Sequence, residues 1–436
     1  MRKQEILKIL EDWNFWKKEQ ETGIERSFYL KKIEKFILSE QIIVITGPRR
    51  SGKSFIIKQM AKKLMNDGVN KNQILIINFE DPRFSELNTA LLQKIYETYL
   101  EFFPQKAKPY IFLDEIQEVE KWEKWVLTMQ ELKKAHIIVS GSNAKLLSKE
   151  FSTLLSGRHL DITVLPLCFK EFLDFKGLKL KDDLDLISNE IKIKSLFQEY
   201  IQNGSFPELA IKENKKEILL TYFNDLLEKD IIRRYKIRKK EQVKKLLKFY
   251  FSNVSCLMSF NSIEKFLGIS ADTIEKFSDY FENAYLLFFL KRFSFKVREQ
   301  EKSPRKVYGI DPGLINTISF KFSENIGKLA ENIVFLKFLQ KKFQNPDLEI
   351  YYWKDEQHRE VDFLVKEKNI IKSLYQVCWD LSDLKTKQRE IKSLIKASNE
   401  LKCSNLLVIT DDYDGEEKIK GKKIKFVSLW KWLMEH

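Results

Sequence analysis

Short apolar runs alternate with longer amphipathic segments over the first 165 residues of the chain. Five of these runs predict strands, at residues 42–45, 74–79, 110–113, 137–139 and 161–165. Segments of helical length separate the first four runs, and the residues before position 40 are also helical in pattern. Because strands alternate with helices, the pattern predicts a parallel sheet covered on both faces, and residues 1–165 are expected to form one α/β domain.

The pattern becomes mostly helical from Pro166 onward. Apolar residues recur at helical spacing over residues 169–175, 191–202 and 215–234, with a break at Gly204-Ser205-Phe206-Pro207. A basic run follows at residues 236–248, which suits a solvated helix face as well as a phosphate-contacting surface. Residues 166–240 are therefore expected to form a helical domain.

Two predicted helices, at residues 261–267 and 271–285, meet across the turn Gly268-Ile269-Ser270. Apolar strand segments at 286–295 and 307–310 follow, joined by a charged loop, which predicts a winged helix-turn-helix over residues 241–320. The basic side chains of its wing would contact DNA phosphates, namely Lys296, Arg298, Lys302, Arg305 and Lys306. The second helix carries four acidic residues that phosphates would repel, so a winged helix used for packing or oligomer contacts stays open.

The last segment, residues 321–436, mixes helices with strands. It begins with a helix at 326–342 and continues with strand-like runs at 349–353, 359–365 and 374–379. A charged helix at 384–401, strands at 406–410 and 423–427 and a short Trp-rich helix complete the chain. This order predicts a second α/β domain.

The sequence after the first predicted strand carries the strongest chemical signal. The segment Gly47-Pro48-Arg49-Arg50-Ser51-Gly52-Lys53-Ser54 fits the phosphate-binding pattern G-x-x-x-x-G-K-[ST], and Phe55 continues into a predicted helix. Backbone N–H groups of such a loop and the helix N-terminus favour anionic phosphate. Lys53 would reach the β- and γ-phosphates, and Ser54 would supply a hydroxyl to Mg²⁺. The chain is therefore expected to bind a nucleoside triphosphate.

Polar side chains follow the later strands of the same domain. Asp114 and Glu115 end the third strand, where Asp114 would hold Mg²⁺ and Glu115 would orient water for in-line attack. Ser142 and Asn143 follow the fourth strand, where they would sense the γ-phosphate or position water, unless they form an ordinary polar loop. Arg158 precedes the fifth strand and would stabilise transition-state charge in cis or in a neighbouring subunit, although a surface or packing role is an alternative.

Composition adds a basic net charge of +14 across 436 residues. A basic chain favours polyanionic partners, nucleic acid first, although lysine richness also raises solubility or marks a thermophilic surface. The four cysteines and four histidines show no metal-ligand spacing, which argues against a zinc site and suits a reducing cytoplasm. The amino terminus has no signal-peptide pattern, and no apolar stretch is long enough for a bilayer, so a cytoplasmic protein without a membrane partner is expected.

Several motifs together resemble one family. They are the phosphate-binding loop, Asn78-Phe79-Glu80-Asp81-Pro82, Leu113-Asp114-Glu115-Ile116-Gln117, Gly141-Ser142-Asn143, and Ser156-Gly157-Arg158 with Pro166-Leu167. They look like the prokaryotic, mainly archaeal AAA+ ATPases with a C-terminal domain of unknown function (DUF4143). The resemblance implies an additional-strand P-loop NTPase core at 1–165 that uses ATP and Mg²⁺. It also implies a helical lid at 166–240, a winged helix at 241–320 and a PD-(D/E)XK nuclease-like domain at 321–436.

The nuclease-like resemblance is incomplete at its chemical positions. Glu331 and Asp362 match two acidic positions of that family, but Gln376-Val377-Cys378 stands where an active enzyme needs Glu-x-Lys. Losing the carboxylate removes a metal ligand, and losing the lysine removes a cation that polarises water. The resemblance thus implies a vestigial nuclease site around Glu331, Asp362 and Gln376, unless a neighbouring lysine such as Lys354 or Lys372 takes over.

The leading hypothesis is a DNA-binding AAA+ ATPase in which hydrolysis moves the lid and winged helix relative to the core. One alternative is a signal-transducing NTPase switch with slow turnover, and another is an ATP-gated, metal-dependent DNA nuclease. A homo-oligomer, either a ring or a dimer, is compatible with each of them.

Overall fold

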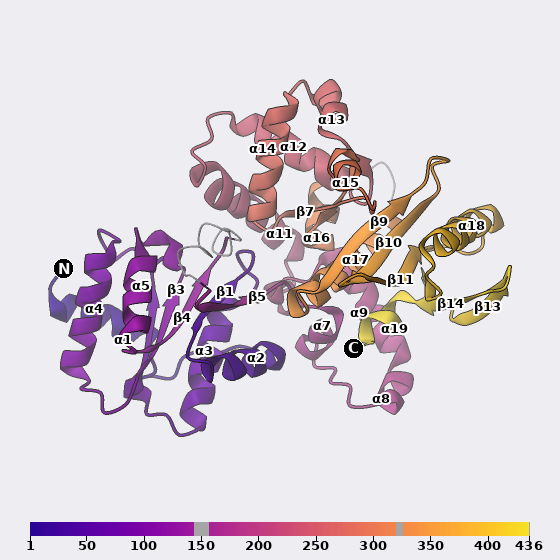
Figure 1. Ribbon diagram of the computed structural model, residues 1–436. Helices are drawn as coiled ribbons and strands as arrows, with labels where there is room; N and C mark the ends of the chain where they lie inside the picture. The colour runs from indigo at the N-terminus through magenta and orange to yellow at the C-terminus, as the bar shows by residue number, and fades with distance from the viewer. Residues whose placement is uncertain (144–156, 320–325, 436) are drawn as a thin grey trace. The chain divides into compact units, whose positions relative to one another are not determined.

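The computed structural model describes residues 1–143, 157–319 and 326–435 (Figure 1). Ser156 of the predicted Ser156-Gly157-Arg158 motif lies outside the described residues. Internal contacts divide the chain into two compact units, Met1–Leu165 and Pro166–His436.

The first unit contains a five-stranded sheet whose strands all run parallel, in the order β2-β3-β4-β1-β5. The predicted parallel α/β sheet is therefore confirmed. The strands are β1 (Ile42–Thr46), β2 (Ile74–Asn78), β3 (Tyr110–Asp114), β4 (His136–Gly141) and β5 (His159–Thr163). The fifth strand begins two residues earlier than the apolar pattern indicates, because polar His159 pairs with Ile42 at the start of β1.

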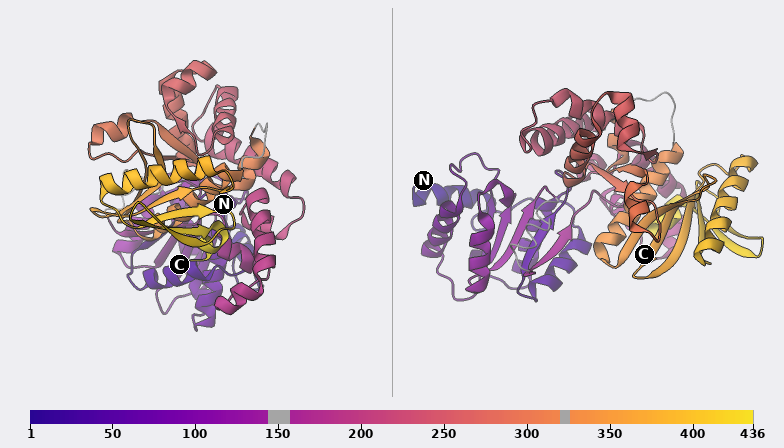
Figure 2. Two further views of the ribbon diagram at one scale, coloured as in Figure 1. Left: turned by 90° about the vertical axis from the view of Figure 1, so that its right-hand side faces the viewer. Right: turned by 45° about the horizontal axis from the view of Figure 1, so that its top comes forward.

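Helices cover both faces of this sheet, as the views in Figure 1 and Figure 2 show. Successive side chains of a strand point to opposite faces, so β1 supplies Val44 to one apolar core and Ile43 and Ile45 to the other. Burial of these two cores is the main term that stabilises the unit. The helices are α1 (Lys3–Trp13), α2 (Ser27–Ile37), α3 (Lys53–Asn66), α4 (Thr89–Phe102) and α5 (Trp122–Glu131).

The second unit begins with helices. They are α7 (Phe169–Phe175), α8 (Asp183–Ser188), α9 (Glu190–Asn203), α10 (Pro207–Ile211), α11 (Lys215–Asp225), a π-helical segment (Leu226–Arg233), α12 (Lys240–Ser252), α13 (Phe260–Leu267) and α14 (Ala271–Asn283). Gly268 ends α13 in the left-handed conformation, with φ +68°, as the predicted tight turn requires.

A small antiparallel sheet has the order β6-β8-β7, in which β6 precedes α13 and the other two strands follow α14. The segment predicted to be a charged loop contains the short helix α15 (Val297–Lys302). Helix α16 (Pro312–Ile318) was also not predicted. The strands are β6 (Leu257–Met258), β7 (Leu287–Leu290) and β8 (Arg305–Gly309).

Asp311, the N-cap of α16, holds the backbone of the segment at residues 204–206 that separates α9 from α10. Its side chain is fully buried and accepts hydrogen bonds from the Ser205 N–H, the Ser205 hydroxyl and the Leu314 N–H. Gly204 has φ +88°, and a Cβ there would lie 2.2 Å from the Asp311 carboxylate. The carboxylate thus replaces water for three donors inside the unit.

We expect Asp311→Ala to lower the free energy of unfolding by about 2–4 kcal/mol, because it leaves buried donors without an acceptor. Urea unfolding followed by circular dichroism measures the change. Asp279→Ala, which alters an exposed residue of α14, should change it by less than about 0.5 kcal/mol. Equal effects of the two variants would show that the Asp311 contacts contribute nothing to stability.

The carboxyl-terminal part holds a six-stranded mixed sheet with the order β13-β14-β12-β11-β10-β9. Strand β12 runs parallel to β11 and β14, and the other neighbours are antiparallel. Edge strand β13 was missed, since its charged sequence has little apolar signal. The elements are α17 (Ile326–Gln344), β9 (Leu348–Lys354), β10 (Glu360–Glu367), β11 (Ile370–Val377), α18 (Leu384–Leu401), β12 (Leu406–Thr410), β13 (Gly415–Ile419), β14 (Lys422–Ser428) and α19 (Leu429–Met434).

Candidate nucleotide-binding site

The phosphate-binding loop joins the end of β1 at Thr46 to the start of α3 at Lys53. Two of its positions require glycine. Gly47 has φ +144°, and a Cβ there would lie 2.0 Å from the Val164 carbonyl oxygen of the neighbouring chain segment. Gly52 caps α3 with φ +97°. The local sequence thus allows the backbone to turn tightly and present the first N–H groups of α3.

Lys53 points back into this loop. Its ammonium donates to the carbonyl oxygens of Gly47 and Pro48, each at 3.1 Å, and lies 3.6 Å from a carboxylate oxygen of Glu115. The residue is 4% exposed. A buried cation held by two carbonyl groups is positioned to exchange these partners for phosphate oxygens.

Asp114 ends β3, with its carboxylate beside Ser140 of β4. The Ser140 hydroxyl donates to Asp114 Oδ1. Burial and the neighbouring Glu115 carboxylate raise the pKa of Asp114 to about 6, although hydrogen bonds from Ser140 and Ser54 and the charge of Lys53 act in the opposite direction. A desolvated carboxylate next to the Ser54 hydroxyl provides the hard oxygen ligands that Mg²⁺ prefers. These two residues therefore fit the ion.

Glu115 adopts the left-handed conformation, with φ 53°. Such a backbone costs a non-glycine residue about 1 kcal/mol or more, and it turns the side chain away from the line of β3. The carboxylate, 6% exposed, accepts a 2.6 Å hydrogen bond from Gln117 Nε2. Gln117 and Lys53 together orient the carboxylate.

Ser142 and Asn143 directly follow β4 and are both buried. Strand β4 lies between β3 and β1, so its carboxyl end meets the same sheet edge as Asp114 and the phosphate-binding loop. Sequence reasoning missed Ser140, the side chain of β4 that contacts Asp114. The sequence feature that could have revealed Ser140 is a hydroxyl side chain that directly follows the apolar residues of this strand.

Arg158 does not join this constellation within the chain. It lies just before β5 at the opposite sheet edge, where its carbonyl accepts from the Ile42 N–H at the start of β1. A five-residue strand spans roughly 16 Å between those edges. The guanidinium pairs with Glu131 of α5. Of the alternatives left open for Arg158, this position favours a role in a neighbouring subunit or at the surface over a role in cis.

Arg26 stabilises the phosphate-binding loop through backbone contacts, a role that the sequence analysis did not predict. Its guanidinium donates to the Ser51 carbonyl at 2.8 Å and to the Leu165 carbonyl at 3.1 Å, and the residue is 4% exposed. Gln59 of α3 accepts from the Arg26 N–H at 3.2 Å. These contacts tie the loop to the segment after β5.

The remaining loop residues lie at the rim. Arg49 forms an ion pair with Glu80, which follows β2. Arg50 has a left-handed backbone, with φ 69°. Phe55 is 43% exposed, and a Cβ at Gly23 would lie 3.1 Å from its ring. Phe55 thus presents an exposed aromatic ring close to the loop.

The predicted wing residues do not share one environment. Lys296, Arg298 and Lys302 are exposed. Arg305 is only partly exposed and lies over the Phe260 ring, 5.6 Å from its centroid. Lys306 is 1% exposed, so its assignment to a DNA-contacting surface is corrected.

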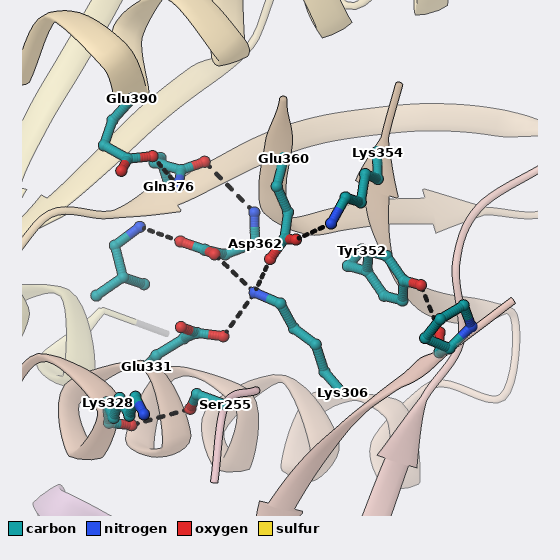
Figure 3. Close-up of polar contacts among 12 residues, drawn as sticks. Ser255, Lys306, Lys328, Glu331, Tyr352, Lys354, Glu360, Asp362, Gln376 and Glu390 are labelled. Atoms are coloured by element: carbon teal, nitrogen blue, oxygen red, sulfur yellow. Dashed lines mark hydrogen bonds and ion pairs between the residues drawn. The ribbon is translucent and has the colours of Figure 1, made fainter. Parts of the chain in front are cut away.

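Lys306 instead lies among the residues of the expected vestigial nuclease site (Figure 3). Glu331 of α17 and Asp362 of β10 both contact its ammonium. Gln376 of β11 accepts from the Asp362 N–H at 3.4 Å. Of the two lysines considered as replacements, Lys354 pairs with Glu360, which also contacts Lys306, and Lys372 pairs with Glu367.

Within residues 1–143, 157–319 and 326–435, no group of three or more His, Cys, Asp or Glu side chains is arranged to hold a metal ion. None of the helices there combines the length and the hydropathy that a membrane span needs.

Three family models match consecutive parts of the chain. An AAA domain matches residues 39–173, and two domains of unknown function match residues 194–325 (DUF8612) and 326–432 (DUF4143). The first and third matches confirm the AAA and DUF4143 parts of the resemblance.

Two relatives are similar over nearly their whole length. The uncharacterized protein MJ1544 of Methanocaldococcus jannaschii is 36% identical over 93% of this chain and 91% of its own length. An uncharacterized protein of Haemophilus influenzae is 30% identical over 93% of this chain and 98% of its own length. Among solved structures, a Walker-type ATPase of Pyrococcus abyssi aligns with a TM-score of 0.42 and 15% identity, over 69% of this chain and 98% of that one.

Proposed function

The chain contains an AAA domain and belongs to the same family as MJ1544, and we propose that it hydrolyses ATP with Mg²⁺, binds DNA and couples hydrolysis to domain movement on the nucleic acid. One observation carries the ATPase part. Lys53, Asp114 and Glu115, which come from α3 and the end of β3, converge at one edge of the parallel sheet.

Each of these residues has a chemical role in the proposed reaction. Mg²⁺, when bound, would neutralise charge on the phosphates, with Ser54 and Asp114 as its protein partners. Lys53 holds the transferring phosphoryl group as its charge shifts to the leaving oxygen. Glu115, held by Gln117, accepts a hydrogen bond from the attacking water and orients it in line.

The proposal of DNA binding rests on an exposed surface around α15, which we call the wing tip. It combines the basic side chains of Lys296, Arg298 and Lys302 with Phe295, which is 82% exposed. Basic groups contact phosphates, and an exposed aromatic ring can stack on a base. The antiparallel pair β7–β8 that carries this tip, following α13 and α14, supports interpreting this part as a winged helix.

We expect replacement of Lys296, Arg298 and Lys302 with glutamate to weaken DNA binding and to flatten its salt dependence. Each lost phosphate contact should change the log–log slope by roughly 0.9. Fluorescence anisotropy over a salt series measures this slope. A control that replaces the exposed Lys418, Lys420 and Lys423 changes the net charge equally, and matched slopes for the two variants would remove the wing tip from the DNA surface.

Arg158 can serve catalysis only from a neighbouring subunit, since it lies far from its own phosphate site. We therefore propose a homo-oligomer in which the exposed Arg158 side chain approaches the nucleotide of the next copy.

The deciding experiment measures ATP turnover with and without single-stranded, duplex and branched DNA. DNA-stimulated turnover that disappears in Lys53→Ala supports the proposal. Slow turnover that is indifferent to every DNA would favour the nucleotide switch instead. Absence of ATP turnover and of nucleotide binding would overturn both.

A further inference from the structure

A buried cluster of charged side chains joins β8 to the carboxyl-terminal sheet (Figure 3). The Lys306 ammonium lies 2.9 Å from Glu331 Oε1, 2.7 Å from Glu360 Oε1 and 2.8 Å from Asp362 Oδ1. Three carboxylates from α17 and β10 thus surround one cation that a different element provides. Carboxylate oxygens are the ligands that hard divalent cations prefer, and here an ammonium lies among them.

We propose that Lys306 is a built-in cation that replaces a divalent metal in this cluster, and that the cluster is a structural lock rather than a nuclease centre. The lock holds the β6-β8-β7 sheet against the carboxyl-terminal domain, because Lys306 belongs to β8 while its partners belong to α17 and β10. Removing the ammonium should leave a latent site for a divalent cation.

The Lys306 ammonium occupies the space that a metal ion would need between the three carboxylates, and other donors contact further atoms of the cluster. Glu331 Oε1 also accepts a 2.7 Å hydrogen bond from the Tyr308 hydroxyl. The second oxygen of Asp362 accepts from the Val377 N–H at 2.9 Å. Gln376, in the position of the missing third carboxylate, donates its amide N–H to Glu390 at 2.6 Å. The residues present therefore do not fit a metal ion while Lys306 is in place.

The protonation of the cluster agrees with this assignment. Burial opposes the charged form of Lys306, yet the surrounding carboxylates keep its pKa well above the usual range. Burial and the nearby Asp362 raise the pKa of Glu331, while the Lys306 ammonium and the hydrogen bonds from Tyr308 and Lys306 favour its ionised form.

The lock can be tested in the full-length chain by removing its carboxylates. Glu331→Gln and Asp362→Asn should each lower the melting temperature by about 5 °C or more in EDTA, because Lys306 then remains buried with fewer partners. If the carboxylates instead formed an empty metal site without a cation, the same two variants would raise the melting temperature, because each would remove one of several carboxylates that repel one another. Unchanged or increased melting temperatures in both variants would overturn the proposal.

The latent site can be tested by removing the cation. In Lys306→Ala, Mn²⁺ titration followed by electron paramagnetic resonance should show one additional binding site. Its affinity should be at least 10-fold higher than that of any Mn²⁺ site in the wild type or in Lys302→Ala. Lys302→Ala removes the same charge from an exposed position. The additional site should disappear in Lys306→Ala with Asp362→Ala. A folded Lys306→Ala variant that binds no additional Mn²⁺ would refute the latent site.

A nuclease assay distinguishes the lock from retained catalysis. The full-length protein with Mg²⁺ or Mn²⁺ should leave plasmid, single-stranded and branched DNA intact. Cleavage that disappears in Asp362→Ala would show that the cluster is an active nuclease centre and would overturn the structural assignment.

Discussion

Glu115→Gln is expected to slow ATP turnover by at least about 100-fold while leaving ATP binding nearly intact. The amide keeps the shape of the side chain but cannot accept the hydrogen bond that orients the attacking water as strongly as a carboxylate does. Lys53 is expected to keep its contacts with Gly47 and Pro48 in this variant, so the phosphate-binding loop should stay formed. Single-turnover hydrolysis and binding of a fluorescent ATP analogue measure the two quantities separately.

The matched control for this variant is Glu120→Gln, the same chemical change at an exposed position five residues further on. Its turnover should remain within about twofold of the wild type. Turnover near the wild-type rate in Glu115→Gln would remove Glu115 from the catalytic role. A parallel loss of nucleotide binding would instead show that the carboxylate is needed to keep Lys53 in place.

The parts of the site predicted from the sequence are those whose chemistry follows from local order. The backbone conformation of the loop requires glycine at Gly47 and Gly52, and Lys53 and Ser54 directly follow at the start of α3. Asp114 lies at the end of an apolar strand, and parallel strands bring such ends to one edge. Sequence spacing therefore suffices to place these residues together.

The parts that the sequence did not reveal depend on contacts between distant segments. Arg26 reaches Ser51 and Leu165, which are 25 and 139 residues away. Lys306 follows a charged segment that contains the exposed Lys296, Arg298 and Lys302, so charge pattern alone assigned it to the surface. Side chains alternate between the two faces of β8, and Lys306 lies on the face directed toward Glu331 and Asp362. The pairing of β8 with β6 and β7 determines which face that is.

Asp114→Asn is expected to reduce Mg²⁺-dependent ATP turnover by at least about 100-fold and, at the same time, to stabilise the nucleotide-free protein. The loss of turnover follows from replacing an anionic metal partner with a neutral amide. The gain in stability follows from burial, which raises the pKa of Asp114 to about 6, above the ordinary value of 3.8. The native state therefore binds the proton more tightly than the unfolded chain, and stability falls as the pH rises between these two values.

Above pH 6 the ionised, desolvated carboxylate destabilises the native state by up to about 3 kcal/mol, from roughly 1.4 kcal/mol for each unit of pKa difference. Asp114→Asn should remove most of this penalty, so urea unfolding at pH 7.5 should show a variant about 1–3 kcal/mol more stable than the wild type. At pH 5 the wild-type carboxyl group is mostly protonated, and the difference should shrink. Glu120→Gln should show no comparable gain at either pH. A variant that is inactive yet equally stable at pH 7.5 would mean that the Ser140 and Ser54 hydroxyls and Lys53 already compensate the buried charge, and that Asp114 stores no strain for catalysis.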